Sequence, residues 1–173
     1  MIQELRPSLK VLSEKSNLVG CEVGVDSGEN ALSMLTYLNI KKLYLIDPWM
    51  CYDHMQGHGV ISNSETALKC MEYAKKILAP FEDKLVWLRG LSENMAVHVR
   101  DPLDFAYVDG NHRYPYVLQD IALFYPKIKI GGLIAGHDFK KIYRLQVVKA
   151  VNDYFYPLQK MIRVEDWDWS VEK

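Results

Sequence analysis

Acidic and glycine residues follow the first apolar run of the chain and have the types expected of a ligand-binding turn. The run extends from Leu18 to Val25, and the next segment, residues 29–39, carries apolar side chains at helical spacing. Glycines in a strand-to-helix turn let the backbone come close to a ligand at the helix N-terminus. The acidic side chains disfavour phosphate and favour a cationic or hydroxyl-bearing ligand. A turn with a purely structural role is the alternative. The residues of this predicted turn are Glu22, Gly24, Val25, Asp26, Ser27 and Gly28.

An aspartate closes the second apolar run, residues 43–46, and adds another candidate contact. Asp47 lies 19 residues after Gly28 and directly before Pro48. In nucleotide-binding α/β folds, an acidic side chain at this position accepts hydrogen bonds from ribose hydroxyls. The turn matches neither GxGxxG nor GxxxxGKS, so the pattern favours a nucleoside over a phosphate-rich ligand. An aspartate that only forms the turn before the proline is the alternative.

The elements that would position these residues alternate between strand and helix. Further apolar runs cover 84–88, 103–108 and 130–135, and helical spacing covers 64–79, 115–125 and 142–155, with a short helix from Ser92. This alternation predicts parallel strands with helices on both faces. Residues 160–164 and 169–172 predict a terminal hairpin. We therefore expect an α/β fold, a doubly wound Rossmann-like and mostly parallel seven-stranded sheet with a C-terminal antiparallel hairpin.

Composition places the chain among ordinary globular proteins. Of 173 residues, 49% are hydrophobic, and 21 Lys and Arg nearly balance 22 Asp and Glu, so the charge favours neither nucleic acid nor a membrane as partner. The three cysteines suggest no disulfide framework, and no apolar run is long enough to predict a membrane span. We expect one cytoplasmic domain, residues 1–173, with an N-terminal helical cover over 1–16, its weak helix at 2–15 interrupted near Pro7. We also expect a lid loop for substrate or cofactor over 48–63.

Two longer motifs carry a resemblance to a known family. The first runs from Asp104 to Tyr114 and contains Asp-Gly-Asn-His-Arg-Tyr, and the second runs from Gly131 to Phe139 and contains Gly-His-Asp. With the glycine turn and Asp47, they resemble the signatures of class I S-adenosylmethionine-dependent methyltransferases. The resemblance extends from about Leu18 to the end of the chain. It is to the small-molecule O-methyltransferase-like branch, methyltransferase family 24.

The resemblance implies S-adenosylmethionine as cofactor and assigns residues to each part of it. Glu22 and Asp26 would bind the ammonium group, and Asp47 would hold the ribose hydroxyls. The residues assigned to the methionine moiety and ribose are Glu22, Gly24, Asp26, Gly28 and Asp47. Three further residues are expected to bind the cofactor: Val25, Ser27 and Asp109. Those assigned to the adenine are Pro48, Trp49, Gly90, Leu91 and Ser92. A large aromatic residue beside a strand end is often part of the core, which is the alternative for Trp49.

The resemblance also implies a divalent cation, because metal-dependent members hold one that binds the acceptor's hydroxyl oxygens and lowers their pKa. Asp109, His137 and Asp138 stand at the corresponding positions. The two aspartates suit Mg²⁺, whereas His137 departs from the usual acidic or amide residue. Manganese, iron, zinc or no metal therefore remain alternatives to magnesium.

His112 follows Asp109 by three residues and is the candidate general base, because imidazole titrates near neutral pH. The alternative is a histidine that hydrogen-bonds a carboxylate and orders the loop. We expect O-methylation of a small hydroxylated acceptor, a sugar or a phenol, with His112 and Asp109 as catalytic residues. Two other functions stay open: a metal-dependent enzyme of other chemistry, resembling cephalosporin hydroxylases, and a non-catalytic nucleoside-binding module. Homo-oligomerisation is also expected, because so short a chain has little room for a separate acceptor-binding domain.

Overall fold

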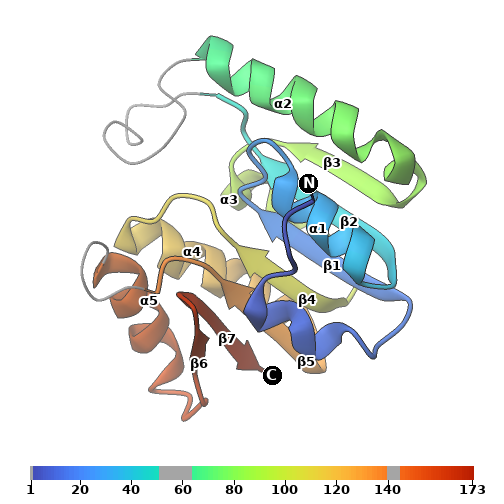
Figure 1. Cartoon of the computed structure of the whole chain (residues 1–173). Helices are drawn as coiled ribbons and strands as arrows, with labels where there is room; N and C mark the ends of the chain where they lie inside the picture. The colour runs from blue at the N-terminus through green and yellow to red at the C-terminus, as the bar shows by residue number, and fades with distance from the viewer. Residues whose placement is uncertain (1, 51–63, 140–144) are drawn as a thin grey trace.

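Strands and helices alternate along most of the chain. The computed structural model describes residues 2–50, 64–139 and 145–173 (Figure 1). The strands are β1 (Leu18–Val23), β2 (Ile40–Asp47), β3 (Leu85–Arg89), β4 (Leu103–Val108), β5 (Ile128–Gly136), β6 (Arg163–Glu165) and β7 (Asp168–Glu172). The α-helices are α1 (Glu29–Tyr37), α2 (Ser64–Leu78), α3 (Ser92–Met95), α4 (Tyr114–Phe124) and α5 (Leu145–Phe155). Short 3-10 helices cover Pro7–Leu12, Ala79–Lys84, Ala96–His98 and Tyr125–Lys127.

The strands form one twisted sheet in the order β3-β2-β1-β4-β5-β7-β6. The first five strands pair in parallel, whereas β7 runs antiparallel to both β5 and β6. The order reverses direction between β1 and β4, so the crevice beyond their carboxyl ends is the expected ligand position. The predicted α/β fold with a terminal hairpin is confirmed.

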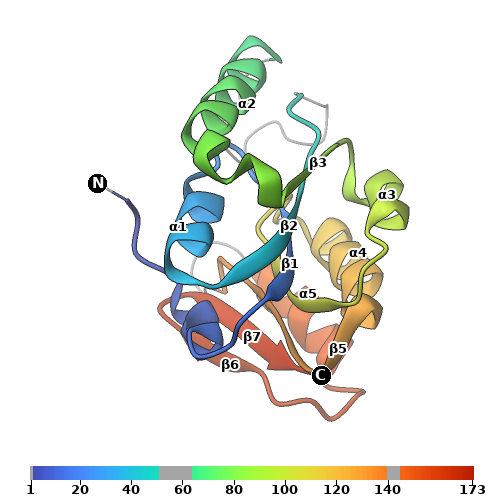
Figure 2. The same ribbon diagram turned by 90° about the vertical axis from the view of Figure 1, so that its right-hand side faces the viewer.

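Each face of the sheet has its own hydrophobic core. Figure 2 shows α1 and α2 on one side of the strands and α3, α4 and α5 on the other. Ala31 and Met34 of α1 pack on the first face, and Ile121 of α4 and Val151 of α5 pack on the second, all fully buried. Burial on both faces explains why the central strands read as continuous apolar runs.

The predicted lid loop lies largely outside the described residues, since 51–63 are not among them. The described start of this segment, Pro48 to Met50, follows β2 directly. Within the described residues, no helix combines the length and apolar character needed to cross a membrane.

The N-terminal cover is shorter and less regular than the sequence predicted. Instead of a helix over 2–15, the structure has a 3-10 helix from Pro7 to Leu12, preceded by non-helical residues. The chain does change conformation at Pro7, as expected, because proline disfavours helical backbone in the residue before it and belongs in the first turn of a helix. Arg6 accordingly has φ −53° and ψ 136°. We call residues 2–12 the N-terminal strap.

A buried aspartate fastens the strap to the sheet. The Ser8 hydroxyl donates a 2.7 Å hydrogen bond to Asp168 Oδ2 at the start of β7, and the Tyr107 hydroxyl donates to Oδ1 of the same carboxylate at 3.1 Å. Leu9 and Leu12 are buried in the hydrophobic core that also contains Ala31 and Met34 of α1. The strap is therefore held by polar and apolar contacts together.

Replacing Ser8 by alanine should loosen this attachment. The Ser8→Ala variant removes the shorter of the two side-chain hydrogen bonds to the buried Asp168 carboxylate, and we expect the free energy of unfolding to fall by about 1–3 kcal/mol. Urea denaturation followed by circular dichroism measures the change. Ser13→Ala, an exposed hydroxyl just beyond the strap, is the matched control and should change stability by less than about 0.5 kcal/mol. Equal effects of the two substitutions would contradict the anchoring role.

Candidate functional site

A cavity of about 660 Å³ opens beyond the carboxyl ends of β1, β2, β3 and β4. Its volume lies in the range of small-molecule sites. Most of the predicted binding residues line it. They are Glu22, Gly24, Val25, Asp26, Ser27, Asp47, Pro48, Gly90, Leu91, Ser92, Asp109 and His112. The structure thus brings together segments that are distant in the sequence, as the strand-end argument requires.

The glycine turn owes its path to two positive φ angles. Gly24 has φ +87°, and a Cβ there would lie 2.3 Å from the backbone oxygen of Asp109, so any side chain would collide with the end of β4. Gly28 has φ +79° and caps α1, where a Cβ would lie 3.0 Å from the Cβ of Ala74 in α2. Gly24 therefore shapes the cavity wall, whereas Gly28 lies behind it and serves helix packing.

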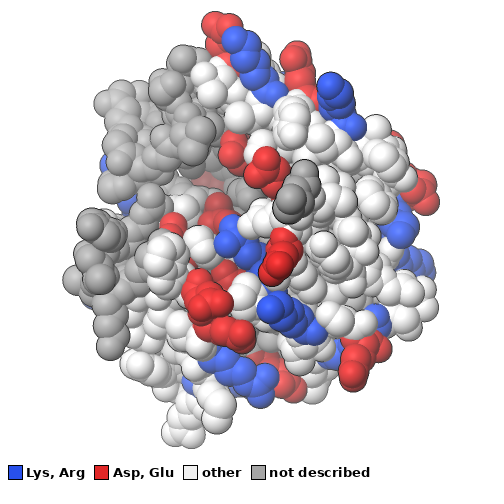
Figure 3. Space-filling view, viewed as in Figure 1, with Lys and Arg blue, Asp and Glu red and all other residues white. Residues whose placement is uncertain are grey.

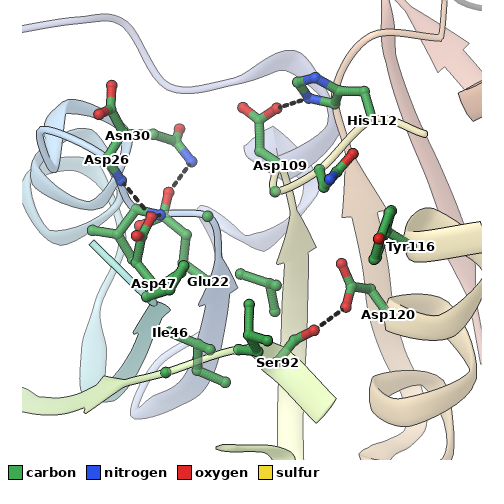
Figure 4. Close-up of a pocket in the computed structure, with 18 of the residues that line it drawn as sticks. Glu22, Asp26, Asn30, Ile46, Asp47, Ser92, Asp109, His112, Tyr116 and Asp120 are labelled. Atoms are coloured by element: carbon green, nitrogen blue, oxygen red, sulfur yellow. Dashed lines mark hydrogen bonds and ion pairs between the residues drawn. The ribbon is translucent and has the colours of Figure 1, made fainter. Parts of the chain in front are cut away.

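Asp47 holds the turn by its carboxylate. Oδ2 accepts hydrogen bonds from the backbone N–H groups of Val25 and Asp26, at 2.9 and 3.0 Å, and Figure 4 shows the bond from Asp26. Oδ1 accepts one from the backbone N–H of Trp49 at 2.7 Å. Burial raises the pKa of Asp47 in spite of these three donors. The predicted contact of Asp47 with a ribose stays a prediction, and the structure adds a structural task for the same side chain.

Trp49 lies in the core and not among the described residues of the cavity wall. Its side chain is 1% exposed, its indole N–H donates to the Asp26 carbonyl at 2.9 Å, and its ring lies 5.7 Å from that of Trp87. The structure therefore favours the core role for Trp49 over contact with adenine. Its φ of +42° and that of Asp26, +48°, place two non-glycine residues in the left-handed region beside the cavity, where strain often accompanies function.

Three buried oxygen atoms on one side of the cavity have no hydrogen-bond partner: Glu22 Oε2, Asp26 Oδ1 and Asn30 Oδ1. We call these three residues the acceptor cluster. The Asn30 amide donates to the other Glu22 oxygen at 2.7 Å, and Figure 4 shows the three side chains close together. Buried acceptors without partners are costly, so they fit a ligand that brings ammonium or hydroxyl donors.

Glu22 has a strongly perturbed carboxyl group at the cavity wall. Burial, with smaller contributions from Asp109 and Asp47, raises its pKa to about 8, although the Asn30 hydrogen bond acts in the opposite direction. A bound cation would favour the charged carboxylate and so stabilise the ionised form. The site is thus prepared for positive charge.

A histidine lies within reach of two carboxylates on the other side of the cavity. His112 Nε2 is 3.0 Å from Asp109 Oδ1 and 3.4 Å from Asp138 Oδ2. Carboxylates only accept hydrogen bonds, so this network assigns the proton to Nε2 and, in neutral histidine, the lone pair to Nδ1. We call Asp109, His112 and Asp138 the histidine–carboxylate cluster. Nδ1 is then the atom able to accept a proton.

The predicted metal site at Asp109, His137 and Asp138 finds no support among the described residues. Among the described residues, no group of three or more His, Cys, Asp or Glu side chains is arranged to hold a metal ion. His137 Nδ1 lies 3.7 Å from Asp138 Oδ1, and burial is the main reason that its pKa is lowered. Instead, the His112 imidazole reaches both aspartates, and the Arg6 guanidinium, 3.9 Å from Asp109 Oδ2, already supplies positive charge there.

Comparison with known proteins identifies the family. A family model described as a methyltransferase domain matches residues 21–139, from the glycine turn to the end of the second motif. The chain belongs to methyltransferase family 24. The resemblance inferred from the motifs is therefore confirmed.

Individual relatives of this methyltransferase-family chain are distant. An uncharacterised protein of Acanthamoeba polyphaga mimivirus is 28% identical over 156 residues, which cover 84% of this chain and 63% of that protein. The structure of the O-methyltransferase NovP matches with a TM-score of 0.65 and 14% identity, covering 94% of this chain and 74% of that one. An rRNA methylase from Streptococcus thermophilus matches with a TM-score of 0.65 and 16% identity over 100% and 98%. At these identities the solved structures establish the fold of this family member and no more.

Several residues of the cavity wall escaped the sequence analysis. Asn30 is only the second residue of α1, where a polar residue draws no notice. Asp120, 4% exposed, accepts a hydrogen bond from the Ser92 hydroxyl, and burial raises its pKa to about 7. A signal for it did exist, since Asp120 shares helical spacing with Val117 and Phe124 on the apolar face of α4. Arg6 and Tyr116 also line the cavity.

The raised pKa of Glu22 gives the methyltransferase-family domain a specific pH dependence. Between the ordinary pKa of 4.5 and the folded value of about 8, folded protein keeps a proton that unfolded protein releases. Stability should therefore fall as pH rises through this window, by up to about 1.4 kcal/mol per pH unit from this group. Urea denaturation from pH 5 to pH 8 should show wild type losing stability relative to Glu22→Gln, which lacks the titration. Parallel pH curves would refute the assignment. Glu29→Gln, at an exposed site at the start of helix α1, should track wild type.

Proposed function

We propose that this protein transfers a methyl group from S-adenosylmethionine to a hydroxyl oxygen of a small acceptor. The observation that carries the proposal is the acceptor cluster, three unpaired buried oxygen atoms beside the glycine turn in a cavity of small-molecule size. Membership in a methyltransferase family supports the reaction class.

The residues of the cavity wall fit S-adenosylmethionine. Glu22, Asp26 and Asn30 offer acceptors for the ammonium group and hydroxyls. Asp47, at the end of β2, lines the same cavity and would contact the ribose. Seven Asp and Glu side chains against one Arg among the described lining residues suit a ligand with net positive charge. When bound, S-adenosylmethionine supplies a methyl group on a positively charged sulfur, ready for displacement.

The histidine–carboxylate cluster supports oxygen as the methylated atom. A hydroxyl group is a weak nucleophile until a base removes its proton, and His112 Nδ1 is such a base at the edge of the cavity. Asp109 accepts the hydrogen bond from Nε2 and orients the ring, and the Asp138 carboxylate 3.4 Å away adds negative charge that stabilises the imidazolium that forms. Methyl transfer also requires that the acceptor oxygen and the methyl group are held in line and away from water, and the cavity would hold both reactants in this way.

Two observations bear on the other functions that the sequence left open. The alternative function, a metal-dependent enzyme resembling cephalosporin hydroxylases, requires a metal. The described side chains form no group of three or more ligands arranged to hold one. A non-catalytic nucleoside-binding module would need the acceptor cluster but not the histidine–carboxylate cluster. The second cluster therefore favours an enzyme.

Methyl transfer tests the proposal directly. We expect wild-type protein to transfer radioactive methyl groups from labelled S-adenosylmethionine to at least one member of a panel of catechols, phenols and sugars. His112→Ala should reduce the rate by about 10²–10⁴-fold because the base is lost, while the affinity for S-adenosylhomocysteine stays within about twofold. His98→Ala, at an exposed position, is the control. Cofactor binding without transfer to any acceptor would favour the nucleoside-binding module instead.

Chelation tests whether a cation takes part. Because His112 and not a metal activates the acceptor in this account, dialysis against EDTA should leave the methyl-transfer rate unchanged within about twofold. Added Mg²⁺ should not raise it. A loss of activity on chelation that is restored by Mg²⁺ or Mn²⁺ would show that the cavity acquires a metal with its acceptor and would overturn the base assignment.

A further inference from the structure

Among the described residues that line the cavity, Arg6 is the only arginine, and there is no lysine. Arg6 comes from the N-terminal strap and not from a strand end, so the usual search for ligand-binding positions misses it. Seven acidic side chains line the same wall. Figure 3 shows Asp and Glu atoms gathered around the hollow in this face of the molecule, with basic atoms among them.

The Arg6 guanidinium has unused hydrogen-bonding capacity. Its Nε is buried and has no partner, and its Nη2 lies 3.9 Å from Asp109 Oδ2, beyond hydrogen-bond distance. The side chain is only 22% exposed. Guanidinium offers five donors in a planar fork, and leaving a buried one unpaired is costly. A ligand with a matching pair of acceptors would remove that cost.

The backbone around Arg6 is fixed on both sides. Leu5 before it is buried in the core, and Pro7 after it restricts the local conformation. Ser8 is fastened to Asp168 by its hydroxyl at 2.7 Å. The folded strap therefore presents the guanidinium to the cavity before any ligand arrives, which reduces the entropy lost on binding.

We propose that Arg6 binds the α-carboxylate of the cofactor's methionine moiety, while the acceptor cluster binds the ammonium group of the same amino acid. This inference rests on the proposed function and extends it to a specific subsite. A carboxylate matches the guanidinium fork with two parallel hydrogen bonds. A phosphate dianion would meet the repulsion of Glu22, Asp26, Asp47 and Asp109, whereas a zwitterion places its positive group beside them.

The position of Arg6 relative to Glu22 agrees with this division of tasks. The two residues line one cavity, and the charge of Arg6 acts on the Glu22 carboxyl and lowers its pKa in part. An amino-acid group has its ammonium and carboxylate on the same carbon, so its binding groups must be near one another. A carboxylate on the acceptor is the other possible source of this chemistry, and the experiment separates the two.

A pair of ligands that differ only in the carboxylate tests the subsite. Calorimetry would compare S-adenosylhomocysteine with its decarboxylated analogue, in which hydrogen replaces the carboxylate, on wild type and on Arg6→Met. We expect Arg6→Met to weaken S-adenosylhomocysteine about 10–100-fold, the range for a charged hydrogen-bonded pair. The decarboxylated analogue should bind both proteins within about twofold. Lys10→Met removes an exposed charge from the same strap and should change neither affinity.

The possible outcomes are distinct. If Arg6→Met loses affinity equally for both ligands, Arg6 only supports the fold of the site. If it loses affinity for neither ligand, the partner of Arg6 is a carboxylate on the acceptor. Each result overturns this inference while leaving the proposed function intact. Failure of wild type to bind S-adenosylhomocysteine would overturn both. Thermal unfolding of Arg6→Met within a few degrees of wild type would confirm that a loss of affinity is not a loss of structure.

Discussion

The carboxylate of Asp47 accepts three backbone N–H groups, from Val25, Asp26 and Trp49, and the cavity depends on those bonds. They tie the end of β2 to the turn after β1, so the turn keeps its left-handed conformation at Asp26. Without these three bonds, the turn would not be fixed in the conformation that buries the acceptor cluster. A single side chain thus joins sheet geometry to the ligand-binding wall.

The charge distribution of the cavity follows from that arrangement. Acidic side chains from the ends of β1, β2 and β4 meet at the cavity wall, and burial raises the pKa of Glu22 there to about 8. A positively charged ligand offsets the cost of this burial, so a feature that destabilises the fold becomes a source of affinity. Arg6 and His112 lie at the same wall and divide it into a part that suits an amino acid and a part that suits proton transfer.

The fold was predictable because its signals are local. Apolar runs separated by helical spacing specify parallel strands, and the acidic and glycine residues after them mark the binding edge. The errors concern long-range packing. Nothing local in the sequence shows that Trp49 packs against Trp87, that His112 reaches Asp138 in the presumed place of a metal, or that the strap brings Arg6 to the cavity. Those contacts depend on how distant segments meet, which spacing alone does not encode.

The central claim is that the cavity beyond β1 and β2 binds the nucleoside and amino acid of S-adenosylmethionine together. Isothermal titration of the purified protein with S-adenosylhomocysteine tests it most directly. The account predicts saturable binding with one ligand per chain, and a large loss of affinity in Asn30→Ala, which removes one acceptor and the hydrogen bond to Glu22. Absence of binding heat and of any thermal shift at millimolar ligand would contradict the account.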